Sequence, residues 1–475
     1  MSKLYVIAIG GTGSRVLRSL TMLAAAGVDI HANEIVPVII DPDVSNADLT
    51  RTVTLMNRYK TIRKGIDFHD QNETGFFRTE ISQIVQNYTL HIKKTENKPF
   101  KEFIEYSTLS KEDKAMVSML FSEKNLNANM EVGFKGNPNI GSVVLNQIEK
   151  SPQFIEFANS FAEGDKIFII SSIFGGTGAS GFPLLLKTLR KQNSTFPNHS
   201  FINKAQIGAI TILPYFKLQP SEESEIDSST FISKARSALA YYETNVVDNE
   251  SINALYYLAD NGNIYENNEG GELQQNPAHF IEFIAATAAF HFMNTDFADK
   301  HLNLEFGIHD INDNDGITFS TFYPDAESLL MKPMTQLAMM SNCLQKGSTQ
   351  YKFVTSGDLV ANEIICEKEK FYSTPFFNEL NAFLMNYRGW LRELSDNKRS
   401  LNLFNLECGD KPFELVKDRK PQQGGFLGLG KKDYEAFYDA LNKAAQKVRG
   451  DKASSLFIEI YSRATKKMAE DKLKM

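Results

Sequence analysis

Two glycine-rich turns are the stretches of this sequence whose residue types and spacing best fit chemistry. The first comprises Gly10, Gly11, Thr12, Gly13 and Ser14. The second comprises Gly175, Gly176, Thr177, Gly178, Ala179 and Ser180. Each follows an apolar run and precedes an apolar helical pattern. A glycine turn in this place lets backbone N–H groups approach a phosphate closely, and the dipole of the next helix favours the anion. Two such turns predict one shared polyphosphate site.

Other interpretations of these turns stay open at this point. Either turn alone could serve only the packing of a strand against a helix. The first turn also fits the start of a nicotinamide-dinucleotide fold, an oxidoreductase fold in which Asp41 would bind the ribose. However, Val16 stands where the third glycine of that pattern belongs, and the second turn would then have no role. A P-loop is excluded because neither turn ends in glycine, lysine and a hydroxyl residue.

Apolar runs bounded by Gly, Pro, Asp or Asn alternate with helical segments up to about residue 260. These runs are Leu4–Ile9, Ile35–Ile40, Ile167–Ile173, Ile207–Leu213 and Leu255–Ala259. Short runs that are apolar throughout fit strands buried on both faces of a parallel sheet. Their alternation with helices predicts an α/β fold with a doubly wound, mostly parallel sheet. We assign residues 1–275 to this nucleotide-binding domain, with a helical insertion at about 50–130.

The rest of the chain is predicted to be mostly helical. Residues 276–294 are apolar around most of the helix circumference, which predicts a buried central helix. Residues 295–420 are expected to form a second, largely helical α+β domain, whose best strand candidates are 317–324 and 351–356. Residues 421–475 are expected to form a linker and a C-terminal helical region, because 420–433 are rich in glycine and read as a flexible loop.

Composition narrows the class of protein. A chain of 475 residues is long enough for at least two domains. Its formal net charge of −7 argues against a general nucleic-acid binder, because no basic excess is present to neutralise phosphates. Three widely spaced cysteines indicate a reduced compartment and no metal motif. With no room for a signal peptide and no apolar run long enough to span a membrane, we expect a cytoplasmic protein.

Several motifs, taken in chain order, resemble the tubulin/FtsZ superfamily of nucleotide-binding proteins. The stretch FGGTGASG is similar to its signature GGGTGS/T, with Phe174 in place of one glycine. VIAIGGTGSRVL, VIIDPDVSNADL, GFKGNPNIG, AITILPYF and MNTDFAD resemble further motifs of the superfamily, in the same order. The resemblance covers about residues 3 to 299. The form GGTGSRVL is most similar to bacterial tubulin-like proteins.

The resemblance implies a ligand and the residues that hold it. The ligand would be GTP or GDP, with Mg²⁺ held mainly by phosphates and water, so that no residue is assigned as a metal ligand. Gly136 and Asn137 would close over the terminal phosphate. Asn276 would read the guanine base, although an asparagine there is equally suited to cap the central helix. Glu225 is the candidate for the ribose.

The resemblance also implies how hydrolysis would occur. In the superfamily, the segment after the central helix of one subunit completes the nucleotide site of the next subunit. The matching residues here are Asn294, Asp296 and Asp299, whose carboxylates would orient the attacking water. The alternative is that Asp296 merely caps a following helix. We therefore expect a GTPase that assembles head to tail into a homopolymer.

Two other functions stay open. The chain could be a nucleotide-dependent scaffold or switch that binds GTP with little hydrolysis, since its C-terminal half is mostly helical and the insertion could block a subunit contact. The oxidoreductase above is the remaining alternative. An unidentified protein partner could bind through the insertion or the C-terminal helices.

Overall fold

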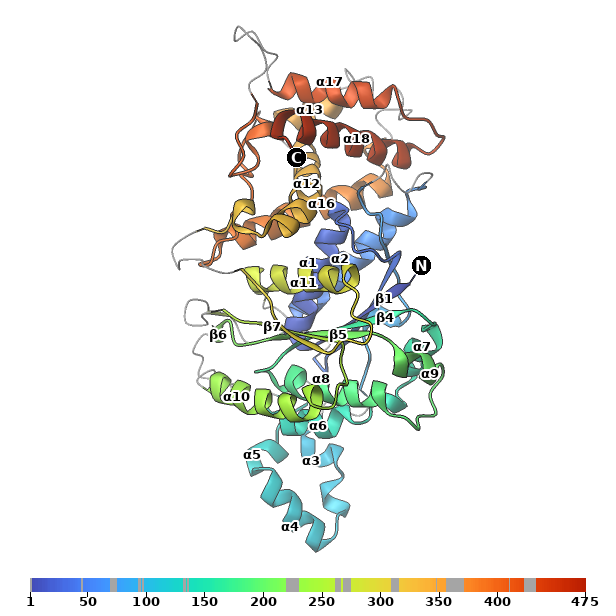
Figure 1. The fold of residues 1–475 in the computed structure, drawn as a ribbon, viewed down its shortest axis with the longest axis vertical. Helices are drawn as coiled ribbons and strands as arrows, with labels where there is room; N and C mark the ends of the chain where they lie inside the picture. The colour runs from blue at the N-terminus through green and yellow to red at the C-terminus, as the bar shows by residue number, and fades with distance from the viewer. Residues whose placement is uncertain are drawn as a thin grey trace.

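The computed structural model describes most of the chain and shows an elongated, layered molecule (Figure 1). The described residues are 2–43, 46–68, 75–92, 95, 98–130, 134, 136–218, 230–260, 266–267, 275–308, 316–346, 348–355, 371–409, 411–422 and 433–475. Along its longest axis, C-terminal helices at one end are followed by a helical layer, the sheet, a second helical layer and a protruding arm (Figure 1).

One seven-stranded sheet forms the centre, in the order β3-β2-β1-β4-β5-β7-β9, and every pair of neighbours is parallel. Its strands are β1 (Lys3–Ile9), β2 (Glu34–Ile40), β3 (Glu80–Ile81), β4 (Lys166–Ser172), β5 (Ile207–Ile212), β7 (Ala254–Leu258) and β9 (Leu302–Glu305). Strands β6 (Lys217–Leu218) and β8 (Glu266–Asn267) form a separate pair. Alternate residues of β1 enter different cores: Val6 packs on one face of the sheet and Ile7 on the other. The predicted doubly wound α/β sheet is confirmed.

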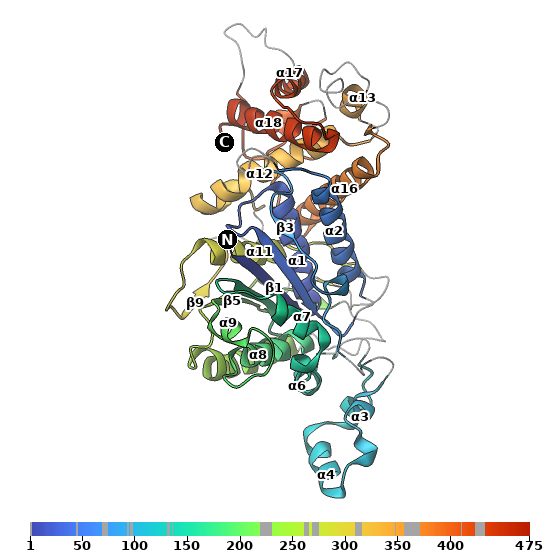
Figure 2. The same ribbon diagram turned by 90° about the vertical axis from the view of Figure 1, so that its right-hand side faces the viewer.

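Helices cover both faces of the sheet (Figures 1 and 2). One face carries α1 (Gly10–Ala26), α2 (Ala47–Lys64) and α11 (Phe280–Asn294). The other carries α6 (Pro138–Leu145), α7 (Pro152–Ser160), α8 (Gly176–Arg190), α9 (His199–Lys204) and α10 (Phe231–Tyr242). Because the strands are apolar on both sides, both layers are needed to remove them from water.

Helix α11 is the predicted central helix, and its start differs from the prediction. Its side chains are buried almost all round, between the sheet at Phe168 and the C-terminal half at Trp390. The N-cap is His279, whose Nδ1 accepts a hydrogen bond from the Ile281 N–H. Burial lowers the pKa of His279 to about 3, so the ring is neutral and can accept that bond. The alternative that Asn276 caps this helix is wrong, because the cap is His279.

The C-terminal half is helical, as predicted, but its two strand candidates are wrong. Its helices are α12 (Pro324–Cys343), α13 (Thr349–Thr355), α16 (Pro375–Asp396), α17 (Asp433–Ala445) and α18 (Ala453–Leu473). Within 317–324, Ile317 makes one isolated bridge and Pro324 starts α12, where proline is favoured. Residues 351–355 lie in α13, whose first turn is fixed by Ser348 Oγ accepting from the Tyr351 N–H. Most of the predicted loop at 420–433 lies outside the described residues.

The predicted insertion is shorter than expected. Residues 47–64 form α2 and residues 80–81 form an edge strand, so both belong to the α/β domain. What protrudes is residues 98–130, here called the arm, with the short helices α3 (Phe100–Phe103), α4 (Lys111–Leu120) and α5 (Glu123–Leu126) (Figures 1 and 2). No helix in the described part of the chain is long and apolar enough to cross a membrane.

Candidate nucleotide-binding site

The two glycine turns meet at one edge of the sheet. Strands β1 and β4 are parallel neighbours with Ala8 opposite Ile170, so both end at the same edge. A Cβ atom on Gly10 would lie 3.4 Å from Thr177 Cβ and 3.7 Å from the Gly178 nitrogen. The third predicted segment joins them, since a Cβ atom on Gly176 would lie 3.1 Å from the Asn137 nitrogen. Three segments far apart in sequence therefore converge.

Glycine is required in these turns by close backbone approach and by backbone conformation. A Cβ atom on Gly178 would lie 2.4 Å from the Ser172 carbonyl oxygen, and one on Gly13 would lie 2.8 Å from the Ala8 carbonyl carbon. Gly10 has a φ of +72°, in the left-handed region that glycine tolerates. These glycines let α1 and α8 begin directly where β1 and β4 end.

The helix N-termini at this edge are suited to bind an anion. No side chain caps α1, α6 or α8, and the first turns of these helices contain no acidic residue. Helix α2 differs, because Asn46 caps it and Asp48 lies in its first turn. Uncapped N–H groups and three helix dipoles together favour negative charge. The arrangement fits a di- or triphosphate.

In the two glycine turns, backbone N–H groups are better placed than the serine hydroxyl groups to bind an anion. Ser14 Oγ donates to the Gly11 carbonyl oxygen at 2.9 Å, and Ser180 Oγ donates to the Gly176 carbonyl oxygen at 2.7 Å. Both hydroxyl hydrogens are thus used inside their own helices. Thr177 and Ala179 are buried, whereas Gly11, Thr12 and Gly175 are half-buried at the surface of the turns.

A buried pair of carboxylates lies beside the first turn. Asp41 and Asp43 follow β2, whose last residue Ile40 pairs with Ile9, and the Asp43 N–H donates to Asp41 Oδ1 at 3.1 Å. Burial and the neighbouring Asp43 raise the pKa of Asp41 to about 7. Among the described residues, no group of three or more metal-ligating side chains is present.

We predict a pH dependence of stability from Asp41. Its pKa is raised in the folded state from the ordinary 3.8 to about 7, so the folded state holds the proton more tightly than the unfolded state. The free energy of unfolding should therefore fall as pH rises from about 4 to about 7, by up to about 4 kcal/mol. Urea unfolding at pH 5 and pH 8, without nucleotide, should show about 2.5 kcal/mol of this fall, because part of it already occurs below pH 5. Asp41→Asn should reduce it, whereas Asp248→Asn, at an exposed site, should leave it unchanged.

Asn276, the candidate for base recognition, is held by the carboxylate of Asp48. The N–H and Nδ2 of Asn276 donate to the Asp48 carboxylate, both at 3.3 Å, just before α11. Arg15 of α1 lies beside this pair, 3.9 Å from Asp48 and 2.5 Å from Glu282. Glu225, the ribose candidate, lies outside the described residues. Asp48, Arg15 and Glu282 were not predicted as site residues. The available signal in the sequence was a charged residue on an otherwise apolar face of a helix.

The same ionic cluster joins the site to the C-terminal half. Arg18 of α1 donates to both carboxylate oxygens of Glu393 on α16, at 2.7 and 3.0 Å, and Arg51 lies 3.3 Å from Glu393. The Ala278 N–H also donates to Glu393, at 2.8 Å. Burial alone would raise the pKa of Glu393, but Arg18 and Arg51 lower it, so the carboxylate is charged. Helix α16 is thus tied to the segment that starts the central helix.

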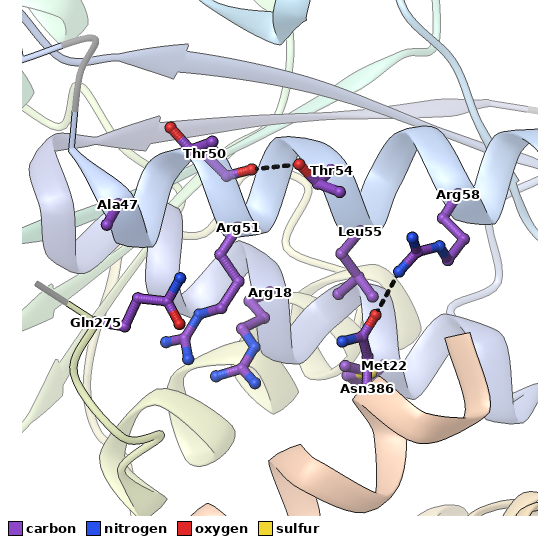
Figure 3. Close-up of a pocket in the computed structure, with 10 residues that line it drawn as sticks. All are labelled: Arg18, Met22, Ala47, Thr50, Arg51, Thr54, Leu55, Arg58, Gln275 and Asn386. Carbon is purple, nitrogen blue, oxygen red and sulfur yellow. Dashed lines mark hydrogen bonds between the residues drawn. The ribbon is translucent and has the colours of Figure 1, made fainter. Parts of the chain in front are cut away.

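A cavity of about 370 Å³ opens beside this cluster, between α1, α2 and α16 (Figure 3). Figure 3 shows the guanidinium groups of Arg18 and Arg51 near each other, next to Gln275. Arg58 donates to Asn386 Oδ1 at 2.7 Å and pairs with Glu379 at 2.8 Å. Each of the three arginines has an acidic partner, so the cavity is not an anion site in its own right.

The candidate catalytic residues lie at the opposite edge of the sheet. Asn294 ends α11, and Asn294, Asp296 and Asp299 are all exposed. The loop after Asn294 is held at the edge of the sheet where the strands begin. Asn253 directly precedes β7, and its Nδ2 donates to the Phe297 carbonyl oxygen at 3.3 Å. The strands rise about 3.3 Å per residue, so the two edges are separated by roughly 20 Å. Within one chain, Asp296 therefore cannot reach the glycine turns.

Asp296 does not cap a helix. Its Oδ1 accepts from the Ala298 N–H at 2.9 Å within a turn, and the next element is strand β9. Asp299 follows with a φ of +56°. The alternative that Asp296 is the N-terminal anion of a following helix is wrong, and the turn instead holds Asp296 at the surface.

Neither a protein-family model nor a curated protein matches this sequence. Among solved structures, the chain is similar to CetZ1 from Haloferax volcanii as a GDP-bound monomer, at 13% identity, covering 54% of this chain and 51% of that one, with a TM-score of 0.28. It is similar to CetZ2 from Haloferax volcanii as a GTPγS-bound protofilament, at 13% identity, covering 55% and 49%, with a TM-score of 0.26. It is also similar to an FtsZ mutant from M. jannaschii, at 17% identity, covering 54% and 46%, with a TM-score of 0.26.

These matches span about half the length of the proteins concerned.

Proposed function

We propose that this protein binds a guanine nucleotide at the glycine turns and hydrolyses it when a second copy docks head to tail. One observation supports this above all. The segment that would supply the catalytic carboxylates lies about one strand length away from the turns, at the opposite edge of the same sheet. A head-to-tail contact brings these two edges together, and a heterologous contact of this kind builds filaments when it does not close.

The glycine turns and the Asn137 loop would hold the phosphates. Backbone N–H groups at the starts of α1 and α8 would bind the phosphates from two sides, while Gly136 and Asn137 would face the terminal one. Asn276 would contact the guanine base, with Asp48 fixing the orientation of its amide. The choice of guanine follows the motif resemblance.

The loop of the next copy would complete the site. Asp296 and Asp299 would orient and deprotonate the attacking water, and Asn294 would help to position it. Mg²⁺, bound with the nucleotide, would offset the negative charge on the phosphates. The backbone donors of the glycine turns would stabilise the charge that develops in the transition state.

The hydrolysis rate per subunit against protein concentration tests this proposal, with light scattering recorded in parallel. We expect the rate to rise steeply above a threshold concentration and the scattering to rise at the same point. A rate per subunit that is independent of concentration, in a protein that binds GTP tightly, would contradict completion of the site between copies.

A second candidate function is a nucleotide-dependent switch with little hydrolysis. The contacts of Glu393 with Arg18 and with the Ala278 N–H favour it, because they connect the nucleotide edge to the helical C-terminal half. In that case, GTP binding should change the protease sensitivity of the C-terminal half, while hydrolysis stays near zero at every concentration.

A further inference from the structure

The arm carries an apolar stripe that nothing in the described chain covers. Met116, Met119 and Leu120 of α4 are 62%, 88% and 63% exposed. Their spacing of i, i+3 and i+4 places them on one face of the helix. None of the residues of α4 is buried. A contiguous methionine-rich surface of this kind is typical of an interaction site.

The stripe has an acidic end. Glu112 and Asp113 precede Met116 by four and three residues, so they lie one turn before it on the same side of the helix. Lys114 is turned elsewhere, because its Nζ donates to the Ser107 carbonyl oxygen at 2.9 Å and lies over the Tyr106 ring. An apolar groove with a basic rim would match this surface.

Such a groove lies on the C-terminal half, between the end of α12 and α16. Its volume is about 230 Å³, below the usual range of small-molecule sites. Leu344, Leu384 and the exposed Met385 provide apolar walls. The basic side chains that line it are Lys346, Arg388 and Arg392. Arg392 pairs with Glu407 at the surface. Because three basic side chains line the groove and Glu407 offsets only one of them, the groove remains basic on balance.

Gly389 indicates that the groove is kept open. It lies inside α16, where glycine is less favourable than alanine. A Cβ atom on Gly389 would meet no atom within 4 Å, and its φ is not in the left-handed region. Packing among the described residues therefore does not require glycine here. A glycine that leaves a hollow in an apolar, basic-rimmed groove makes room for a side chain from outside.

We propose that the arm of one copy docks its Met116–Leu120 stripe into the α12–α16 groove of a second copy. The two surfaces cannot meet within one chain, because the arm and the C-terminal helices lie at opposite ends of the long axis, with the sheet between them (Figures 1 and 2). The charges are complementary, acidic beside the stripe and basic around the groove. The acidic end of the stripe also disfavours an anionic membrane as the occupant.

This contact is distinct from the head-to-tail contact proposed above. It runs along the long axis of the molecule, whereas the nucleotide contact joins the two ends of the strands. Because it uses different surfaces on the two copies, it is heterologous and can link nucleotide-dependent filaments side by side. The surfaces are small, so the contact is expected to be weak and dependent on concentration.

Disulfide trapping between two singly substituted copies tests the contact. One copy carries Met119→Cys and the other Met385→Cys, both with Cys366→Ser, since Cys343 and Cys408 are buried. Mixed under mild oxidation without nucleotide, they should form a cross-linked heterodimer. Ile232→Cys replaces Met385→Cys in the control, because Ile232 is 63% exposed on α10 and outside the groove. Absence of the cross-link, or an equal yield with Ile232→Cys, would overturn the proposal.

Filling the groove provides a second readout. Gly389→Leu should lower the cross-link yield at least tenfold, while Gly389→Ala should keep most of it, and both should unfold at or above the wild-type temperature. An unchanged yield with Gly389→Leu would contradict docking in the groove. Binding to phosphatidylserine vesicles that is lost with Met119→Asp, in the absence of any cross-link, would assign the stripe to a membrane surface.

Discussion

Asp296→Ala is expected to lower the GTP hydrolysis rate per subunit by at least about 100-fold, the range in which a general base or water-positioning carboxylate contributes. Asp296 is exposed, and although the variant loses the bond from the Ala298 N–H to the Asp296 carboxylate, the contact of Asn253 with the Phe297 carbonyl still holds the loop. The substitution therefore removes a carboxylate without disturbing the core. GTP affinity and head-to-tail assembly should stay near the wild-type level, because the variant keeps its own glycine turns.

Glu163→Ala is the matched control for this prediction. Glu163 is also exposed and lies shortly before β4, at the same edge of the sheet as Asp296. We expect it to hydrolyse GTP at the wild-type rate. Steady-state phosphate release above the assembly threshold measures both variants. An equal loss in both, or a wild-type rate in Asp296→Ala, would remove Asp296 from the catalytic assignment.

Gly178→Ala is expected to weaken nucleotide binding by at least about 100-fold. The new Cβ atom would lie 2.4 Å from the Ser172 carbonyl oxygen. This oxygen belongs to the central strand β4, so it cannot move without disturbing the sheet. The first turn of α8 must shift instead, so its N–H groups lose their alignment with the phosphates. Each hydrogen bond to a charged group contributes about 1.5–3 kcal/mol to the binding free energy. Fluorescence titration with a labelled GTP analogue measures the affinity.

The control for this prediction is Gly389→Ala. It is the same chemical change at a helical glycine whose Cβ position is open, far from the glycine turns. Its nucleotide affinity should equal that of the wild type. Thermal unfolding shows whether Gly178→Ala is folded at the assay temperature. A folded Gly178→Ala protein with wild-type affinity would contradict the assignment of this turn to the phosphates.

The sheet and the glycine turns could be predicted because their signals are local. Strands buried on both faces are continuously apolar, and each glycine turn directly follows its strand in sequence. The ionic cluster could not be predicted in this way. Arg18 and Glu393 are 375 residues apart, and their contact exists only because α16 packs beside α1 and α2. The role of Asp48 beside Asn276 likewise depends on a contact across 228 positions.

The wrong predictions have physical causes of the same kind. The aromatic and β-branched run at 317–324 resembles a strand, but Pro324 begins a helix there, and within the described residues Ile317 makes a single isolated bridge, to Leu401. The polar stretch from residue 50 has no sequence pattern typical of a strand. Its two-residue strand β3 forms only because it pairs with β2. Tertiary contacts overrode local propensity in both places.

Mixing the two inactive variants tests the central claim most directly. Asp296→Ala keeps an intact nucleotide site and lacks the carboxylate, while Gly178→Ala lacks nucleotide binding and keeps the carboxylate. If one site is built from two copies, each variant alone should be nearly inactive, and a mixture in equal amounts should recover a substantial part of the wild-type hydrolysis rate. A mixture that stays as inactive as its components, although the two variants co-assemble, would contradict a site shared between copies.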